Sequence, residues 1–262
     1  MHFKPKKRLG QNFLVDKNIQ RKILEYLELD GKEVYLEIGA GRGELTRWVA
    51  KKAKRVYALE IDAQLCSVLR NLAGELPNIK VIQQNILEFD FNKHFQRLKS
   101  KIKVLGNIPY YISTPIIEYL FNCREKIDCI FMTVQKEFAE RLVASAGSKA
   151  YASLSCFVQY YAHPEVLFTI SKGCFFPVPK VDSSFIRLKI RPKPILQPEG
   201  EKLLFLIIRT AFGQRRKTLR NSLAGLVPEE SLERFFSLSS KDRNIRPEYL
   251  TLEDFMNLSK IV

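Results

Sequence analysis

The 262-residue sequence is poor in the side chains that build metal and redox sites. It has three histidines and five cysteines, and none of the cysteines shows zinc-like spacing or lies beside a histidine. We therefore expect reduced thiols and no metal site. No apolar run reaches the roughly 18 residues of a membrane-spanning helix. The basic N-terminus also lacks the apolar stretch of a secretion signal. These absences predict a cytoplasmic protein with no membrane partner.

Acidic residues are also scarce, with 28 Asp and Glu against 43 Lys and Arg and a net charge of +15. Such an excess favours a polyanionic partner, most simply a nucleic acid. A generic basic surface would give the same total, so charge alone does not separate the two alternatives. The placement of the charges along the chain is more informative.

Strand-like and helical runs alternate along the first half of the chain. Strands are expected at 33–38, 55–61, 79–84, 101–106 and 129–134. Helical spacing is found at 18–29, 43–52 and 63–72, and Asp16 is suited to cap the first of these helices. This alternation predicts an α/β fold with a doubly wound sheet of parallel strands.

The pattern changes in the second half of the chain. Residues 153–161 and 183–190 are predicted to be late strands, paired antiparallel at the sheet edge. The Pro-rich stretch at 191–194 indicates a linker. Beyond it, helices are expected at 200–212, 215–225, 228–238 and 251–260. We therefore place an α/β domain at 1–190 and a small all-helical domain at 191–262.

A glycine loop, Gly39-Ala40-Gly41-Arg42-Gly43, follows a predicted strand and opens a helix. Glycines at such a turn let the backbone approach a nucleotide closely, and Glu60 at the end of the next strand is placed to bind ribose hydroxyls. The G-x-G-x-G spacing, preceded by Glu37, resembles motif I of class I S-adenosylmethionine-dependent methyltransferases rather than the dinucleotide pattern. A strand-end acid bonded to neighbouring amides is the alternative for Glu37.

Asn85 follows the third strand, where its side-chain oxygen could accept a hydrogen bond from an adenine amine. A loop asparagine of purely local function is an equally good interpretation of this position alone.

The segment Gly106-Asn107-Ile108-Pro109-Tyr110-Tyr111-Ile112-Ser113 follows the fourth strand. It resembles the N-[IL]-P-Y motif of methyltransferases that modify the exocyclic nitrogen of adenine. That nitrogen is a poor nucleophile because its lone pair is delocalised into the purine. The Asn107 side-chain oxygen and a carbonyl of Ile108 or Pro109 would favour a tetrahedral nitrogen, and Tyr110 would stack on the base. The alternative is a proline turn with two packed tyrosines, and Tyr111 is expected to pack.

A second aromatic candidate lies in Phe175-Phe176-Pro177-Val178-Pro179, a loop held extended by its prolines. Phe175 is predicted to cover the opposite face of a flipped base. A hydrophobic contact with the helical domain is the competing interpretation, and Phe176 suits that better.

Seven segments together resemble the bacterial ribosomal RNA adenine dimethyltransferases over nearly the whole chain. These are RLGQNFL (8–14), EIGAGRGELT (37–46), LEID (59–62), GNIPYYIST (106–114), VQKEFAERL (134–142), FFPVPKVDSS (175–184) and AFGQRRKTLRNSL (211–223). The resemblance implies a class I methyltransferase fold with a mainly parallel seven-stranded sheet, and S-adenosylmethionine as cofactor. It also implies dimethylation of two adjacent adenosines in the 3′-terminal hairpin of 16S rRNA in the small ribosomal subunit.

The resemblance also implies roles for single residues. Asn12 and Leu14 would lie near the methionine part of the cofactor, and Gly39 in the glycine loop. Glu60 would bind the ribose, residue 85 the adenine, and Asn107 would lie between cofactor and substrate. The family usually has Asp where this chain has Asn85, so an uncharged acceptor replaces a charged one there.

Basic residues gather at two places that suit RNA. The tail candidates are Arg215, Arg216, Lys217 and Arg220. Arg216 and Arg220 are predicted to share one helical face, with Leu219 and Leu223 packing on another. A solvated charged face is the alternative. A second tract, at Lys4, Lys6, Lys7 and Arg8, is expected to be an arm that orders on RNA.

Three other functions fit parts of the pattern. A macrolide-resistance relative that methylates 23S rRNA would share the glycine loop and NIPY, but the QRRKTLRNSL tail favours the small-subunit enzyme. A ribosome assembly factor with secondary methylation remains open. An NAD-dependent enzyme is disfavoured by the glycine spacing. One site and one basic face predict a monomer.

Overall fold

The computed structural model describes residues 5–6, 9–214 and 216–262. The chain divides into two compact units. Unit 1 contains the described residues up to Ala139 together with Glu165–Ile190, and unit 2 contains Glu140–Pro164 and Arg191–Val262. The sequence prediction had assigned 140–164 to the first domain, and the structure groups this segment with the C-terminal helices instead.

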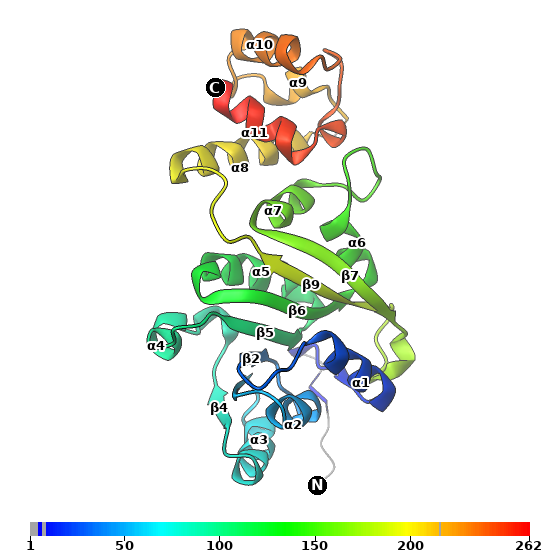
Figure 1. The fold of residues 1–262 in the computed structure, drawn as a ribbon. Helices are drawn as coiled ribbons and strands as arrows, with labels where there is room; N and C mark the ends of the chain where they lie inside the picture. Colours follow the sequence, from blue (N-terminus) through cyan, green and yellow to red (C-terminus); the bar gives the residue numbers. More distant parts are fainter. Residues whose placement is uncertain (1–4, 7–8, 215) are drawn as a thin grey trace. The chain divides into compact units, whose positions relative to one another are not determined.

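A seven-stranded sheet dominates unit 1, and its strands run side by side in Figure 1. Their order is β4-β3-β2-β5-β6-β9-β7. The strands are β2 (Val34–Ile38), β3 (Arg55–Glu60), β4 (Ile79–Gln83), β5 (Ile102–Asn107), β6 (Ile127–Gln135), β7 (Ala162–Ile170) and β9 (Ser183–Ile190). The first five are parallel, and β9 pairs antiparallel with β6. The predicted doubly wound α/β class is thereby confirmed, with the last strand inserted between β6 and β7.

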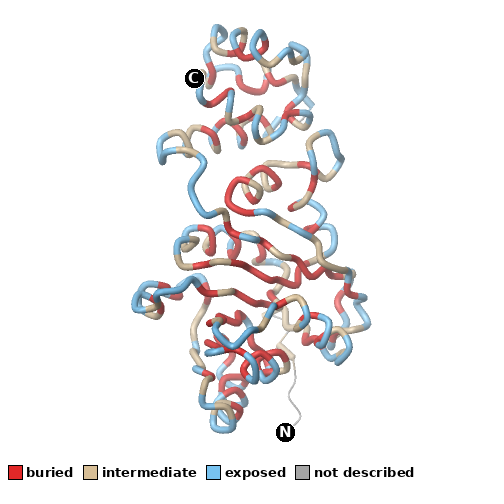
Figure 2. Tube along the Cα trace, viewed as in Figure 1, coloured by how far each residue is buried: buried red, intermediate tan, exposed pale blue. Residues whose placement is uncertain are grey.

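Helices connect the parallel strands, as the alternation predicts. They are α2 (Glu44–Ala50), α3 (Ala63–Glu75), α4 (Phe91–Phe95) and α5 (Ser113–Asn122), with α1 (Lys17–Tyr26) before β2 and α6 (Lys136–Val143) after β6. Asp16 caps α1 by accepting from the amides of Asn18 and Ile19, as expected. All five residues of β2 are buried, because a central parallel strand is covered on both faces. Figure 2 shows buried residues concentrated along the central strands.

The predicted strand at 153–161 is wrong, because these residues form the helix α7 (Ser153–Tyr161). Phe157, Tyr160 and Tyr161 all contact the ring of Phe205 in α8 (Pro198–Gly213). Their i, i+3, i+4 spacing places them on one helical face. A strand would have sent Tyr160 and Tyr161 to opposite faces, so packing onto Phe205 selects the helix. The edge strand follows immediately, as β7.

The regular elements in the described part of unit 2 are all helices, apart from the start of β7. Besides α7 and α8 they include α9 (Leu219–Leu223), α10 (Glu229–Ser239) and α11 (Leu252–Ile261). The helix expected at 215–225 is therefore much shorter and begins only after Thr218, whose hydroxyl accepts from the Asn221 amide and caps it. Among the described residues, no helix has both the length and the apolar character that crossing a membrane requires.

Candidate functional site

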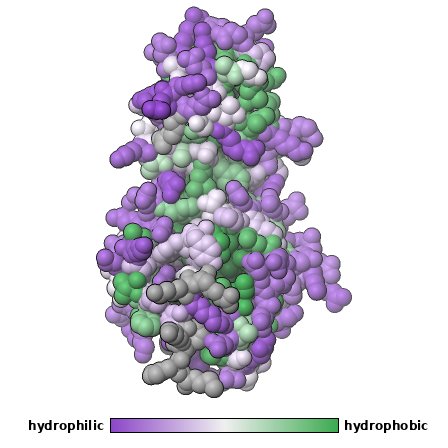
Figure 3. Space-filling view, turned by 180° about the vertical axis from the view of Figure 1, so that it is seen from behind, coloured by the Kyte–Doolittle hydropathy of each residue, from purple (hydrophilic) through white to green (hydrophobic). Residues whose placement is uncertain are grey.

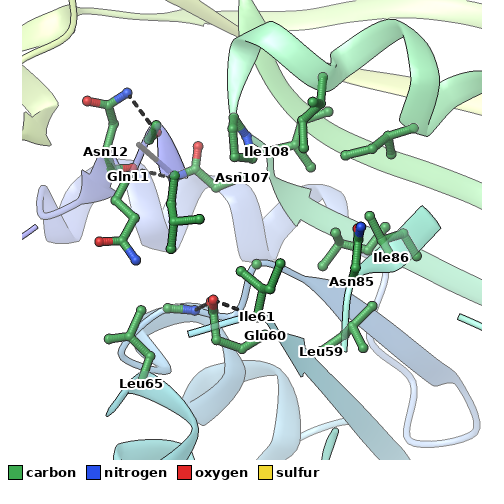
Figure 4. Close-up of a pocket in the computed structure, with 18 of the residues that line it drawn as sticks. Gln11, Asn12, Leu59, Glu60, Ile61, Leu65, Asn85, Ile86, Asn107 and Ile108 are labelled. Atoms are coloured by element: carbon green, nitrogen blue, oxygen red, sulfur yellow. Dashed lines mark hydrogen bonds between the residues drawn. The ribbon is translucent and has the colours of Figure 1, made fainter. Parts of the chain in front are cut away.

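A pocket of about 210 Å³ opens at the carboxyl ends of β2, β3, β4 and β5 in unit 1 (Figure 4). Ligands bind at this edge in open α/β sheets. The lining residues fall into five groups: Leu9–Phe13; Ile38, Gly39 and Gly41; Leu59–Ile61 with Leu65; Gln84–Leu87; and Asn107–Ile112 with Ile116. Most of the wall is apolar, and a few polar groups converge on it, which is typical of a site for a flat organic ligand.

The glycine loop adopts backbone angles that suit glycine. Gly39 and Gly41 have φ of 67° and 59°, in the left-handed region that side-chain-bearing residues rarely occupy. The Gly41 amide donates to Glu60 Oε2 at 3.0 Å, so the loop is tied to the end of the neighbouring strand. Adjacent parallel strands thus bring Gly39 and Glu60 to the same pocket, and their contact with a ligand stays a prediction.

Glu60 lies at the pocket with only 6% of its surface exposed. Its Oε1 accepts from the amides of Ile61 and Asp62 at 2.8 and 2.9 Å. Burial raises the pKa of Glu60, and the hydrogen bonds from Asp62, Gly41 and Ile61 oppose that rise. The amides therefore hold a buried carboxylate at a defined position in the pocket wall.

Glu37 behaves differently from Glu60. It is buried at the end of β2 and is not part of the pocket wall. Its Oε2 accepts from the hydroxyl of Thr46 in α2 at 2.5 Å. Burial raises the pKa of Glu37 to about 8. Glu37 therefore ties β2 to α2 through the hydroxyl of Thr46, and the Thr46 amide also donates to it, in agreement with the alternative interpretation of an acid bonded to neighbouring amides.

Asn85 lies in the pocket wall, directly after β4. Its Oδ1 also accepts from the Leu87 amide at 3.2 Å and caps the short turn Ile86–Glu88. The local role of Asn85 is thus observed, and its contact with an adenine amine stays a prediction. A carboxamide oxygen can accept two hydrogen bonds, so the cap leaves capacity for a ligand amine. The side chains of Ile61 and Ile86 add apolar surface beside it.

The N-terminal segment supplies a further wall of the pocket, through Leu9–Phe13. Asn12 lines the pocket as expected. Leu14 does not: it is 5% exposed and belongs to the hydrophobic core. The reason is strand pairing, because β1 (Phe13–Leu14) pairs antiparallel with β8 (Phe175–Phe176) and alternate residues of a strand face opposite ways.

Asn107 and Tyr110 both line the pocket, as the NIPY interpretation requires. Asn107 Nδ2 donates to the main-chain oxygen of Asn12 at 2.7 Å. The Tyr110 hydroxyl and the Ser183 hydroxyl lie 2.6 Å apart. Tyr111 is 65% exposed rather than packed, which corrects its expected role. Ser183, at the start of β9, was not predicted as a site residue.

Phe175 does not take the predicted place against a base. Its ring is 2% exposed and packs in the core of unit 1, whereas Phe176 is 55% exposed. The strand β8 explains the difference, because it turns the two neighbours to opposite faces. The assignment of Phe175 as an open stacking surface and of Phe176 as a packing residue is therefore corrected.

The basic residues of the tail do not share one helical face. Arg215 lies outside the described residues, and Arg216 and Lys217 are exposed ahead of α9. Arg220 lies within α9 and is ion-paired with Glu229 and Glu233 of α10. Leu219 and Leu223 are buried, as expected. Arg220 thus has carboxylate partners of its own, and the i, i+4 relationship fails because the helix starts after Arg216.

The face drawn in Figure 3 is mostly hydrophilic, with apolar side chains gathered in patches. Of the N-terminal basic tract, Lys4, Lys7 and Arg8 lie outside the described residues. Lys6 forms an ion pair with Asp62 at 2.8 Å. Lys6 is therefore held by unit 1 itself and is not part of an unpaired basic arm.

The fold and the site together define a class of enzyme. An antiparallel β9 inserted next to β6, a glycine loop after β2 and an acid at the end of β3 are the features of class I S-adenosylmethionine-dependent methyltransferases. Comparison with protein families matches residues 2–262 to the family "Ribosomal RNA adenine dimethylase". The chain belongs to this family and is an rRNA adenine dimethyltransferase.

Relatives cover nearly the full chain. A ribosomal RNA small subunit methyltransferase A from Alkaliphilus metalliredigens is 38% identical over 99% of this chain and 92% of its own length. One from Geobacillus sp. is 40% identical over 98% and 91%. Among solved structures, a dimethyladenosine transferase from Plasmodium falciparum is 25% identical with a TM-score of 0.79, covering 94% of this chain and 95% of its own.

The 23S rRNA methyltransferase ErmE is similar in structure, with a TM-score of 0.77 and 25% identity over 95% of this chain and 98% of its own. The small-subunit relatives match at 38–40% identity. The alternative of a 23S-specific enzyme is therefore not favoured.

Proposed function

We propose that the enzyme transfers methyl groups from S-adenosylmethionine to N6 of two adjacent adenosines in the 3′-terminal hairpin of 16S rRNA. The observation that carries this proposal is the placement of Asn107 and Tyr110 at the same pocket as the glycine loop and Glu60. The small-subunit enzymes that the chain resembles support the choice of RNA.

The polar groups of the pocket fit such a methyl donor. Glu60 offers carboxylate oxygens to a ribose diol, and Asn85 offers an amide oxygen to an adenine amine between apolar side chains. Gly39 allows close approach of the backbone, and Asn12, which lines the same pocket, would contact the methionine part of the cofactor. When bound, S-adenosylmethionine supplies an electrophilic methyl group on a positively charged sulfur.

The residues of the NIPY loop act on the target base. Asn107 Oδ1 accepts from the adenine amine and favours the tetrahedral form in which the nitrogen lone pair is available. The Tyr110 ring, held through Ser183, stacks on the purine. The nitrogen lone pair would form the new N–C bond while the C–S bond of the methyl donor breaks, the sulfur keeping that electron pair as a neutral thioether. The nitrogen would then lose one proton to solvent, and exchange of the used donor for a fresh one would allow the second transfer at the same site. No strong base is required, because the methylated nitrogen is acidic.

The RNA partner is supported by charge. The net charge of +15 and the exposed Arg216 and Lys217 suit contact with phosphates. We further propose that a monomer acts on the small ribosomal subunit in the cytoplasm, since one pocket and one substrate hairpin suffice.

The test is transfer of labelled methyl from S-adenosylmethionine to small subunits that lack the modification, with large subunits alongside, followed by nucleoside analysis. Dimethyladenosine confined to small subunits is the expected result. Label in large subunits would instead assign the enzyme to the 23S type. Cofactor binding without label in either subunit would contradict the proposed acceptor.

A further inference from the structure

The N-terminal wall of the pocket reaches the catalytic loop through one hydrogen bond. Asn107 Nδ2 donates to the main-chain oxygen of Asn12 at 2.7 Å, and Figure 4 shows the two residues facing each other. A carbonyl oxygen has no hydrogen to donate, so only the nitrogen end of the Asn107 amide can face it. Asn12 therefore determines that Oδ1 is the end of the amide left for the substrate.

This choice of orientation matters for the reaction. The terminal torsion of an asparagine side chain is broad and roughly two-fold, so a strand end alone does not select one orientation of the amide. A flipped amide would present N–H groups to an amine that is itself a donor, and the acceptor would be lost. The activity of Asn107 thus depends on the position of residues 9–13.

Residues 9–13 are held in turn by the carboxylate of Asp62. Gln11 Nε2 donates to Asp62 Oδ2 at 3.1 Å, and Lys6 Nζ donates to Oδ1 at 2.8 Å. Gln11 Oε1 also accepts from the Lys6 main-chain amide at 2.7 Å. The three side chains form a closed network, here called the Asp62 latch.

Asp62, the acceptor in the latch, is itself held by other hydrogen bonds and lies close to Glu60, the acid proposed to bind the cofactor. The Asp62 side chain is fully buried against 33% exposure of Lys6, and Asp62 also caps α3 through the Gln64 amide. Its own amide donates to Glu60 Oε1. Burial opposes ionisation, but the hydrogen bonds from Lys6 and Gln11 outweigh it and lower the pKa of Asp62.

At its other end the segment packs on the NIPY loop. A side chain on Gly10 would meet Tyr111 Cε1 at 3.0 Å and Pro109 Cβ at 3.2 Å, and Gly10 has φ of 61°. The segment therefore lies close against the loop that carries Asn107, with no room for displacement toward it. It bridges the β3–α3 turn and the catalytic loop.

We propose that Asp62 is a positioning residue: through Gln11 and Lys6 it holds residues 9–13 so that the Asn12 carbonyl keeps Asn107 Oδ1 turned toward the target amine. This inference rests on the acceptor role of Asn107 in the proposed function. It makes the N-terminal segment part of the catalytic geometry as well as a wall of the pocket.

The test uses the full-length chain with Lys6→Met and Gln11→Ala combined, which opens the latch and leaves the α3 cap intact. Single-turnover methyl transfer to unmodified small subunits is measured at saturating S-adenosylmethionine, together with the Kd for cofactor and for RNA. We expect the rate to fall about ten- to hundredfold, the scale of a small misplacement of a reacting group. The matched control is Lys17→Met with Gln96→Ala, two exposed residues outside the pocket.

A second variant guards against a folding defect. Asp62→Asn keeps an efficient N-cap for α3 but removes the charge that binds Lys6. We expect a fall in rate in protein that thermal unfolding shows to be folded at the assay temperature, with some loss of stability because an amide cannot accept from donors on both of its ends. A weaker cofactor Kd with a wild-type rate at saturating cofactor would overturn the inference, because the latch would then serve cofactor binding alone. A wild-type rate in the latch variant would also overturn it. If Asn107→Ala itself retains turnover, the acceptor role fails, which is a separate result.

Discussion

Polar side chains gather in two places in this chain, and different forces fix them. At the sheet edge of unit 1, Glu60 and Asn107 end β3 and β5 and Asn85 lies shortly after β4, and strand pairing brings these three ends to one edge. Around α9 in unit 2, Arg216 lies before the helix, and Arg220 is bound by carboxylates of α10. Backbone pairing determines the first set, and competition among side chains determines the second.

The largest effect is expected at the sheet edge, from Asn107→Ala. Loss of the acceptor should lower the single-turnover methyl transfer rate about 100- to 1,000-fold. The RNA and cofactor Kd should change little, and the thermal unfolding temperature should stay near wild type. Unchanged turnover would show that Asn107 is not the acceptor for the target amine, despite its position at the end of its strand.

A smaller loss is expected from Tyr110→Ala, because stacking on a base contributes about 1–3 kcal/mol. This corresponds to roughly a ten- to hundredfold loss in kcat/KM. Tyr110→Phe keeps the ring and loses only the contact with Ser183, so it should fall much less. Equal losses in the two variants would indicate that the hydroxyl, and not the ring, is the functional part.

A further prediction concerns Glu37, one of the two buried acids, with Glu60, near the ends of the neighbouring strands β2 and β3. The folded protein retains the proton of Glu37 up to about pH 8, whereas the unfolded chain releases it near 4.5. The folded state therefore binds more protons between these values, and the free energy of unfolding falls as pH rises through that window. Glu37→Gln should flatten this fall, as measured by denaturant unfolding at pH 5, 7 and 9. A slope identical to wild type would argue against a proton on Glu37.

In unit 2, the exposed Arg216 and Lys217 should contribute to RNA binding, whereas the ion-paired Arg220 should contribute to stability. Arg216→Ala with Lys217→Ala should reduce the slope of log K against log salt for RNA binding by about 1.5, with stability unchanged.

Arg220→Ala should lower the free energy of unfolding by about 1 kcal/mol, since its ion pairs are partly exposed. If Arg220→Ala instead reduces the salt dependence of RNA binding as much as the Arg216 and Lys217 variant does, Arg220 leaves its carboxylate partners and binds RNA.

The smallest effect, a gain, is expected from Asn85→Asp. A charged acceptor strengthens a hydrogen bond to an amine roughly twofold relative to a neutral one, so cofactor binding should tighten by several-fold. Isothermal titration of S-adenosylmethionine measures it, with Gln96→Glu as a control for added negative charge. Weaker binding in the Asn85→Asp variant would place residue 85 away from the adenine amine.

The sequence predicted the sheet and the residues at its carboxyl edge because both follow from a local period and a strand order. It failed at 153–161, where Phe157, Tyr160 and Tyr161 have the composition of a strand but a helical spacing, and the partner Phe205 decides between them. It also failed at Phe175 and Leu14, whose burial depends on the pairing of β1 with β8. Such long-range pairing leaves no local signal.

The Asp62 latch was missed for a similar reason. Asp62 stands two residues after Glu60 in a recognised motif, and Gln11 stands in another, but nothing in either segment indicates that they bond to each other. Ser183 was also missed, because the predicted role of its segment rested on the phenylalanines. The chemistry of a motif can be predicted from its residue types, whereas contacts between motifs need the fold.

The pairing of β1 with β8 has a consequence for the order in which the enzyme is completed on the ribosome. Phe13 and Leu14 are synthesised before the sheet of unit 1, and their partners Phe175 and Phe176 emerge only after most of that unit. At about 5–20 residues per second, the wait lasts roughly 10 to 30 seconds. During synthesis the glycine loop and NIPY therefore exist before β1 can pair with β8, so contacts available earlier, the Asp62 latch and the hydrogen bond to Asn107, hold residues 9–13 at the pocket until β8 is made.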